Sequence, residues 1–138
     1  MNAIEPASPR TKDMSVTLDG HSLTIDDVAG IARNRRKIEI DREARDRIDK
    51  CRGLLERKIT TREIMYGVNT GIGELADVVL TPEEAERYQK YLLYSHAAGC
   101  GEPCAEEDAR AGILSRLNTH CWGHSGIRFE IVQTRLRC

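Results

Sequence analysis

The chain has 138 residues, which is enough for one modest domain. Lys and Arg number 21 and Asp and Glu 22, a formal net charge of −1, so no overall basic charge favours nucleic acid or an anionic lipid surface. Aromatic residues make up 4%, too few for a platform of stacked bases. No apolar run approaches the roughly 20 residues of a membrane span. The composition predicts a helix-rich protein with neither a nucleic-acid nor a membrane partner.

The five cysteines form an odd set, and no apolar secretory segment stands near the N-terminus, so we expect reduced thiols and a cytoplasmic protein. Cys100 and Cys104 precede His120 and His124 in an order similar to that of zinc-finger ligands. The helix predicted between the two pairs would separate them by about 20 Å. We therefore predict no metal site.

Residues 1–15 carry two prolines and few apolar side chains, a composition typical of a disordered leader. Residues 16–138 are expected to form one segment. At its start, Asp19-Gly20 suits a tight turn between Val16–Leu18 and Ser22–Thr24. This pattern predicts a small β-hairpin with short strands.

Two helices are predicted in the first half of the chain. Apolar residues recur at helical spacing over Ile25–Arg36, where Thr24 and Asp27 match a capping box. A longer amphipathic stripe runs to Ile59 and follows Asp41, a residue suited to the N-cap position.

Three more helices are predicted in the second half. Thr81 as N-cap and Pro82 as the first helical residue begin a helix that runs to about Ala98. The next spans Ala105–His120 and has acidic residues in its first turn. The last begins after Gly126 and has no stop signal before the chain ends, from which we expect a truncated segment.

The segment Tyr66–Leu75 contains three glycines, at positions 67, 71 and 73. Such density defeats helix formation and lets the backbone approach a ligand or move as a lid. A turn that holds a packed tyrosine is the alternative interpretation. The stretch Gly71–Ala76 also fits the permissive dinucleotide fingerprint, but it lacks the flanking strand and helix that such a site needs. We predict no dinucleotide site.

Three motifs follow one another along the chain: Tyr66–Gly73, Ser95–Gly99, and Arg116–Asn118 with Gly123–Gly126. In residue types, order and spacing they resemble the N-terminal part of the aromatic amino acid ammonia-lyase and aminomutase family, which includes histidine, phenylalanine and tyrosine ammonia-lyases. The resemblance implies a mainly α fold, the N-terminal lobe of an all-helical lyase with a small β-hairpin and a glycine-rich loop. It also implies a homotetramer at full length, with a small-molecule aromatic amino acid as ligand.

The electrophile of this family is a methylidene-imidazolone ring formed from an internal Ala-Ser-Gly tripeptide, so the resemblance implies no separate cofactor. Ala-Ser-Gly does not occur in this sequence. In relatives the tripeptide lies shortly beyond the point that corresponds to Cys138. We therefore expect a fragment that ends before this site and is inactive alone.

Tyr66 is the predicted catalytic residue. Removal of the β-proton of an amino acid needs a strong base, and a phenolate is strong but scarce at neutral pH because the reference pKa of a phenol is about 10. Backbone N–H groups near the oxygen favour the phenolate, and glycines permit their approach. By resemblance, Tyr66 takes the proton. The substrate-binding residues that the family implies are Gly67, Gly73, Glu74 and His96.

Glu74 and His96 are expected to lie near the ring of the substrate. A carboxylate and an imidazole can orient a phenol or an imidazole N–H, which an apolar pocket cannot do. Bacterial tyrosine aminomutases resemble this chain at both positions, whereas histidine ammonia-lyases share the histidine and usually have an apolar residue in place of Glu74. Ile72 stands where most relatives have Phe or Tyr. Without the resemblance, a solvated carboxylate and a core or capping histidine would explain both residues.

The residues leave three functions open. The leading hypothesis is the N-terminal segment of a lyase that eliminates ammonia from histidine or tyrosine. A 2,3-aminomutase is the alternative, since it begins with the same elimination and adds the ammonia back to the β-carbon. The third is a non-catalytic helical module that associates with a full-length relative.

Overall fold

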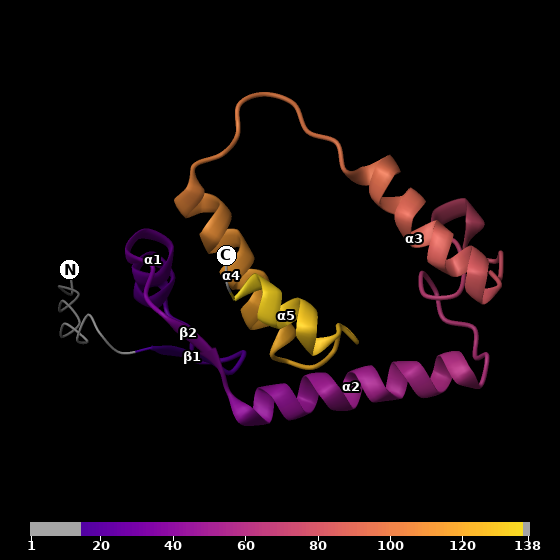
Figure 1. Cartoon of the computed structure of the whole chain (residues 1–138), viewed down its shortest axis with the longest axis horizontal. Helices are drawn as coiled ribbons and strands as arrows, with labels where there is room; N and C mark the ends of the chain where they lie inside the picture. Colours follow the sequence, from indigo (N-terminus) through magenta and orange to yellow (C-terminus); the bar gives the residue numbers. More distant parts are fainter. Residues whose placement is uncertain (1–14, 137–138) are drawn as a thin grey trace, which may run out of the picture. The chain divides into compact units, whose positions relative to one another are not determined.

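The computed structural model describes residues 15–136, and the predicted leader lies, apart from Ser15, outside this range. The described residues form two units, 15–53 with 104–136 and 54–103, which we call the first and the second unit. The elements labelled in Figure 1 are β1 (Val16–Leu18), α1 (Ile25–Asn34), β2 (Ile38–Ile40), α2 (Arg42–Thr60), the 3-10 turn η1 (Gly73–Leu75), α3 (Pro82–His96), α4 (Glu106–His120) and α5 (Phe129–Arg135). The expected mainly α fold is confirmed.

In the first unit, β1 and β2 form a parallel two-stranded sheet, with Val16 opposite Ile38 and Leu18 opposite Ile40. The predicted β-hairpin is therefore wrong. Residues 22–24 form no strand, and the chain passes through α1 before it pairs with β1. Parallel strands need such a crossover, whereas a hairpin joins antiparallel strands.

The turn after β1 explains this path. Asp19 Oδ1 accepts hydrogen bonds from the N–H groups of Ser22 at 2.8 Å and His21 at 2.7 Å, and these bonds lower the pKa of the Asp19 carboxyl to about 2. The side chain of Asn118, on α4, accepts from the N–H of Gly20 at 3.0 Å and donates to its carbonyl at 3.3 Å. Because both peptide groups of Gly20 are bound to α4, they do not join an antiparallel ladder.

The predicted capping box of α1 is confirmed. Thr24 Oγ1 accepts from the N–H of Asp27 at 3.2 Å, and the Asp27 carboxylate accepts from the N–H of Thr24 at 3.3 Å. The Thr24 hydroxyl also donates to this carboxylate and is the main cause of the lowered pKa of Asp27. The helix ends at Asn34, two residues earlier than expected, because Arg35 has a left-handed φ of 52°.

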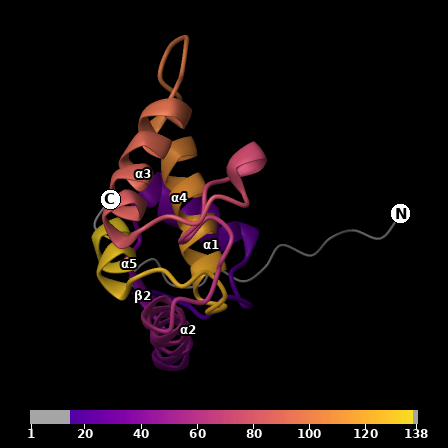
Figure 2. The same cartoon turned by 90° about the vertical axis from the view of Figure 1, so that its right-hand side faces the viewer.

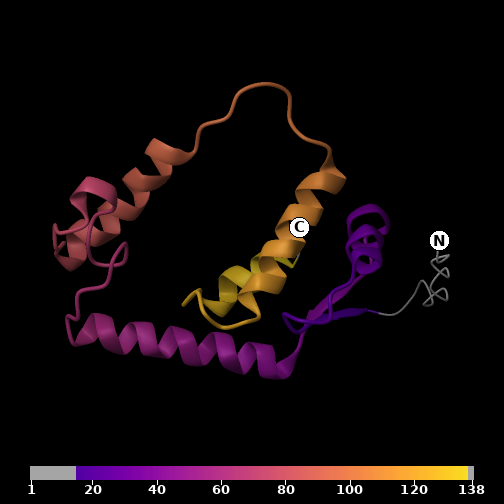
Figure 3. The ribbon, with the colours of Figure 1, turned by 180° about the vertical axis from the view of Figure 1, so that it is seen from behind.

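The buried core lies in the first unit and joins α1, α2, α4, α5 and β1. Its nearly inaccessible side chains include Leu18, Ile48, Leu114, Leu117 and Val132. The predicted N-cap of α2 is confirmed, since Asp41 Oδ2 accepts from the N–H of Ala44 at 3.1 Å. Helix α4 contacts both α1 and α5, and Figure 3 shows α5 folding back beside α4.

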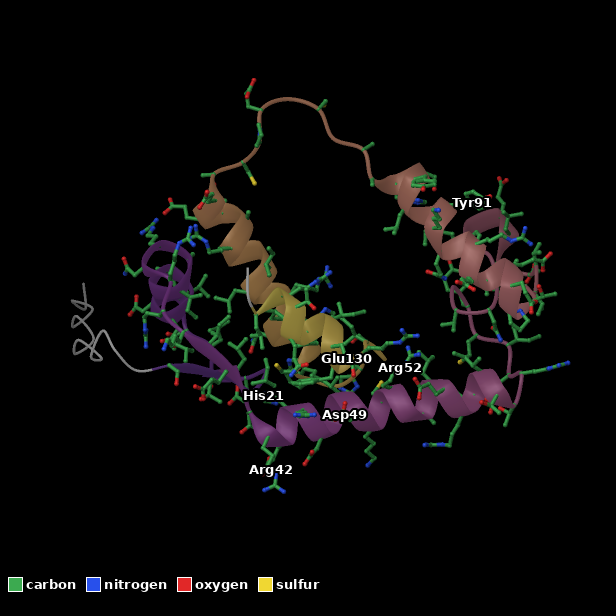
Figure 4. The ribbon with its side chains drawn as sticks, in the orientation of Figure 1. His21, Arg42, Asp49, Arg52, Tyr91 and Glu130 are labelled. Carbon is green, nitrogen blue, oxygen red and sulfur yellow. The ribbon has the colours of Figure 1, made fainter. Side chains whose placement is uncertain are left out.

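The loop between α4 and α5 docks closely on α2. Gly123 has a φ of +72°, and a Cβ built there would lie 2.7 Å from the carbonyl oxygen of Arg47. Arg47 in turn donates to the carbonyl of Cys121 at 3.1 Å, and Arg52, labelled in Figure 4, donates to that of Gly126 at 3.3 Å. The Gly123–Gly126 motif is thus part of the packing of the first unit.

The second unit contains the end of α2, the glycine-rich segment and α3, which Figure 2 shows one after another along the chain. Helix α3 begins with the predicted capping box, in which Thr81 N–H donates to Glu84 at 2.9 Å, and it ends at His96. No apolar side chain of residues 54–103, all of which the structure describes, is buried. Leu93 and Tyr94 on α3 are 67% and 69% exposed, so this unit has no core of its own.

Among the helices within residues 15–136, none has both the length and the apolar character that crossing a bilayer requires.

Truncation of a core side chain tests whether the buried core belongs to the first unit and not to the second. Leu117→Ala removes a side chain that is 1% exposed and should lower the free energy of unfolding by about 2–5 kcal/mol. Leu93→Ala removes the same atoms from an exposed position of α3. This substitution should change the free energy of unfolding by less than about 0.5 kcal/mol. Urea unfolding followed by circular dichroism measures both values, and equal losses would contradict the assignment of the core to the first unit.

Candidate functional site

The glycine-rich segment forms a loop that returns on itself. The N–H of Gly71 donates to the carbonyl of Val78 at 3.1 Å, and the N–H of Leu80 donates to that of Asn69 at 2.9 Å. These bonds frame an isolated antiparallel bridge between Thr70 and Val79. Between the two arms, residues 73–75 form the turn η1 instead of a helix. We call residues 66–80 the glycine loop.

Side chains of the loop hold its first turn, which consists of residues 66–69. Asn69 Oδ1 accepts from the N–H of Met65 at 2.7 Å, while Asn69 Nδ2 donates to the carbonyl of Glu63 at 2.7 Å. The fully buried Thr70 accepts from the N–H of Gly67 at 3.1 Å through its hydroxyl and donates to the carbonyl of Gly71 at 2.8 Å. Both side chains replace the backbone partners that a helix or sheet would supply.

Gly71 marks the closest approach within the loop. A Cβ built at this residue would lie 2.5 Å from the carbonyl oxygen of Leu75 and 2.6 Å from the Leu75 Cβ. Any side chain at position 71 would therefore push η1 away from the first turn. The glycine is needed here for space, whereas Gly67 and Gly73 have left-handed φ angles of +68° and +58° that favour glycine.

Tyr66 projects from the loop with 66% of its surface exposed, so it is not the packed tyrosine of the alternative interpretation. Its Oη accepts a hydrogen bond from the N–H of Gly73 at 3.3 Å. The structure thus brings together two predicted site residues, the phenol and a backbone donor at its oxygen. Such a donor binds a phenolate more strongly than a neutral phenol, because the bond is then charge-assisted.

Helix α3 holds the loop at two points that the sequence analysis did not identify. The hydroxyl of Tyr88 accepts from the N–H of Ile72 at 3.0 Å, and Gln89 Nε2 lies 3.5 Å from the carbonyl oxygen of Gly67, a long hydrogen bond. Ala85, Tyr88 and Leu92 are half-buried at a spacing of three and four residues. This spacing places the three side chains on one face of α3, and it is the feature of the sequence that indicates contact between this face and the loop.

His96 continues this stripe one turn after Leu92, at the end of α3. Its exposed ring places Nδ1 3.0 Å from the carbonyl oxygen of Leu92. The same Nδ1 lies 2.9 Å from the Ser95 hydroxyl, so this nitrogen faces two partners on the last turn of the helix. Tyr88 lies eight residues earlier, or about 12 Å along the helix axis. No described hydrogen bond joins His96 to the loop.

Glu74 lies on the exposed side of η1. Within residues 15–136, no hydrogen bond or ion pair is described for its carboxylate, and the residue is exposed, so it is accessible to a ligand. Of the predicted set, the described contacts therefore join Tyr66 with Gly73, and they leave Glu74 and His96 separate from each other and from the phenol.

A pocket of about 660 Å³ lies between the end of α2, the loop and the start of α3. Its walls include Ile59, Val68, Val79 and Leu80, with Arg62 and Glu83 as its charged residues. None of the predicted site residues lines this pocket. Nowhere within residues 15–136 do three His, Cys, Asp or Glu side chains gather as a metal ion would require.

A sequence profile described as aromatic amino acid lyase matches residues 23–138. The chain belongs to the aromatic amino acid lyase family. It is 39% identical over 119 residues to the histidine ammonia-lyase of Caldanaerobacter subterraneus subsp. tengcongensis, covering 86% of this chain and 23% of that relative. The chain thus spans about a quarter of the length of the curated relatives it matches.

Solved structures of the family share this fold. The histidine ammonia-lyase from Trypanosoma cruzi superposes with a TM-score of 0.82 at 39% identity, and the tyrosine aminomutase from Streptomyces globisporus with a TM-score of 0.84 at 32% identity. Each match covers 90% of this chain and 24% of the other. A match of this coverage extends into both units.

Substitution at Gly71 tests the loop geometry. Gly71→Ala should displace η1 from the first turn, because the new methyl group would overlap the Leu75 carbonyl. The amide resonances of residues 66–75 should then shift in nitrogen–proton correlation spectra. Gly99→Ala is the matched control, since a Cβ there meets open space and no left-handed φ is required. If both variants leave the resonances of the loop unchanged, the close approach does not exist in solution.

Proposed function

We propose that this chain carries the general base of an ammonia-lyase that acts on an aromatic amino acid, with Tyr66 as the catalytic residue. The observation that supports this most directly is the exposed phenol on the glycine loop, with the N–H of Gly73 3.3 Å from its oxygen. Membership in the aromatic amino acid lyase family gives this arrangement its chemical context.

The proposed step is abstraction of a proton from the β-carbon of the substrate. The phenolate oxygen of Tyr66 takes the proton, and the electron pair of the broken C–H bond becomes the second bond between the α- and β-carbons. The amine leaves the α-carbon with its own bonding pair, as ammonia once protonated. The Gly73 N–H holds the oxygen in position and stabilises its negative charge before the transfer.

Amine departure in this family depends on the methylidene-imidazolone electrophile, whose Ala-Ser-Gly precursor is absent from these 138 residues. The described residues include none that would form this group. The residues of this chain contribute substrate contact and proton transfer. Turnover requires the electrophile to be supplied in the same assembly.

Histidine is the substrate that the sequence relatives favour. The Caldanaerobacter relative and the Trypanosoma structure, each 39% identical, are both histidine ammonia-lyases. Glu74 supports tyrosine as the second candidate, because an accessible carboxylate accepts a hydrogen bond from a phenol. A tyrosine 2,3-aminomutase shares the proposed proton abstraction and has a structural relative at 32% identity. We propose that a full assembly is homo-oligomeric, as the family resemblance implies.

A chimera tests the role of Tyr66. In it, this chain replaces the matching part of the Caldanaerobacter histidine ammonia-lyase, which supplies the remaining three quarters. Tyr66→Phe deletes the oxygen that takes the proton and keeps the ring, so ammonia release should fall roughly 10² to 10⁴-fold. The near-ultraviolet absorbance of the electrophile should remain. A Phe variant with turnover close to that of the parent chimera would exclude the phenol as the base.

The other functions give different outcomes in the same assay. A β-amino acid product that forms from the α-amino acid identifies an aminomutase. A folded chimera that has the electrophile but no turnover with histidine, tyrosine or phenylalanine supports the non-catalytic module. The 138-residue chain alone should release no ammonia.

Substitutions of Glu74 and His96 test their role in substrate choice. Glu74→Gln should change the ratio of kcat/KM for histidine and tyrosine by about 10- to 100-fold, the effect of one weakened hydrogen bond to a charged group. His96→Phe should change the same ratio by about two- to tenfold, the effect of one ordinary hydrogen bond. Asp77→Asn is the control, because this exposed carboxylate belongs to the same loop and has no proposed role. If the ratio moves no further in the test variants than in this control, both residues are solvated side chains.

A further inference from the structure

Two tyrosine hydroxyls bind consecutive backbone amides of the glycine loop. Tyr66, within the loop, accepts from the N–H of Gly73 at 3.3 Å, and Tyr88, on α3, accepts from the N–H of Ile72 at 3.0 Å. The first bond is local and belongs to an exposed ring. The second is made by a half-buried side chain sixteen residues away, so it connects the loop to a different element.

Ile72 is held on both sides. Its N–H donates to Tyr88, and its carbonyl accepts from the N–H of Leu75 at 3.1 Å. This carbonyl and the N–H of Gly73 belong to the same planar peptide group, so they point in opposite directions and turn together. The N–H that meets Tyr66 can therefore keep its direction only while Ile72 keeps its conformation, which is extended, with φ −125° and ψ 162°.

Helix α3 provides a firm support for this contact. Its first turn is closed by a capping box between Thr81 and Glu84, and the bond from the Thr81 backbone is the main cause of the lowered pKa of Glu84. Tyr88 lies in the second turn, beyond this cap. The neighbouring Gln89 reaches the carbonyl of Gly67, the residue after Tyr66. Adjacent residues of α3 thus contact the loop near both partners of the Tyr66–Gly73 bond.

We propose that Tyr88 is a positioning residue for Tyr66: by accepting the N–H of Ile72, its hydroxyl holds the loop in the conformation that directs the Gly73 N–H at the phenol oxygen. The inference rests on the proposed function of Tyr66 as the base. Tyr88 acts through the backbone and takes no proton from the substrate.

Amide exchange in the 138-residue chain tests the positioning. Solvent-exchange NMR that resolves fast amides gives separate rates for Ile72 and Gly73. Tyr88→Phe should raise both rates about two- to tenfold, the effect of losing one hydrogen bond at each amide. Tyr66→Phe should raise the rate of Gly73 alone. The control is Tyr91→Phe, because Tyr91, labelled in Figure 4, is 61% exposed on the same helix and should change neither rate.

The result at Gly73 decides the proposal. If Tyr88→Phe raises the rate of Ile72 and leaves that of Gly73 unchanged, the two bonds are independent and Tyr88 does not position the base. If neither rate changes, the Tyr88 bond is absent in solution and the proposal is equally overturned. Far-ultraviolet circular dichroism confirms that each Phe variant keeps the helix content of the parent chain.

Kinetics of the chimera separate this inference from the proposed function. Tyr88→Phe should lower kcat several-fold with little change in KM, because substrate binding is retained while the base is less well oriented. A chimera that keeps its turnover after Tyr66→Phe refutes the base assignment, whatever the exchange rates show. A chimera that loses turnover in Tyr66→Phe but keeps its full kcat in Tyr88→Phe refutes the positioning role alone.

Discussion

The glycine loop depends on the close approach of Gly71 to Leu75. Backbone atoms of η1 occupy the space in which a side chain at position 71 would lie, and this contact closes the loop between Tyr66 and the turn. Closure brings the Gly73 N–H within hydrogen-bond distance of the Tyr66 oxygen. The geometry of the proposed base therefore requires the missing Cβ at Gly71, which permits the close approach, as well as the hydrogen bonds that this approach makes possible.

Local signals were sufficient to predict most of the helices, because caps are interactions between residues three apart. Thr24 with Asp27 and Thr81 with Glu84 form the predicted boxes. The hairpin failed because its outcome depended on Asn118, which binds both peptide groups of Gly20 from 98 residues away. A turn-forming dipeptide indicates that the chain turns, but the partner of the strand is decided by the tertiary structure.

The candidate site also combines features that a local sequence motif predicts with features that only the tertiary structure reveals. The family motif led to Tyr66, and the structure adds the exposed ring and its backbone donor. Tyr88 was not predicted, because its importance comes from one hydrogen bond across the second unit and a tyrosine on a helix is ordinarily a packing residue. Glu74 and His96 remain predictions. Their role in choosing a substrate depends on contact with the bound aromatic ring, which the family motif implies.

The balance of forces in the second unit explains why several hydrogen bonds are needed to orient the phenol of Tyr66. This unit buries no apolar side chain, so hydrophobic burial does not fix the conformation of the loop. Each hydrogen bond contributes only about 0.5–1.5 kcal/mol to its stability. A single bond of this strength, such as that from Gly73 to Tyr66, would leave the ring free to turn for an appreciable fraction of the time. The bonds of Asn69, Thr70 and Tyr88 restrict the same short backbone, so the entropy of ordering it is lost once and shared among them. The orientation of the base is therefore a property of this network.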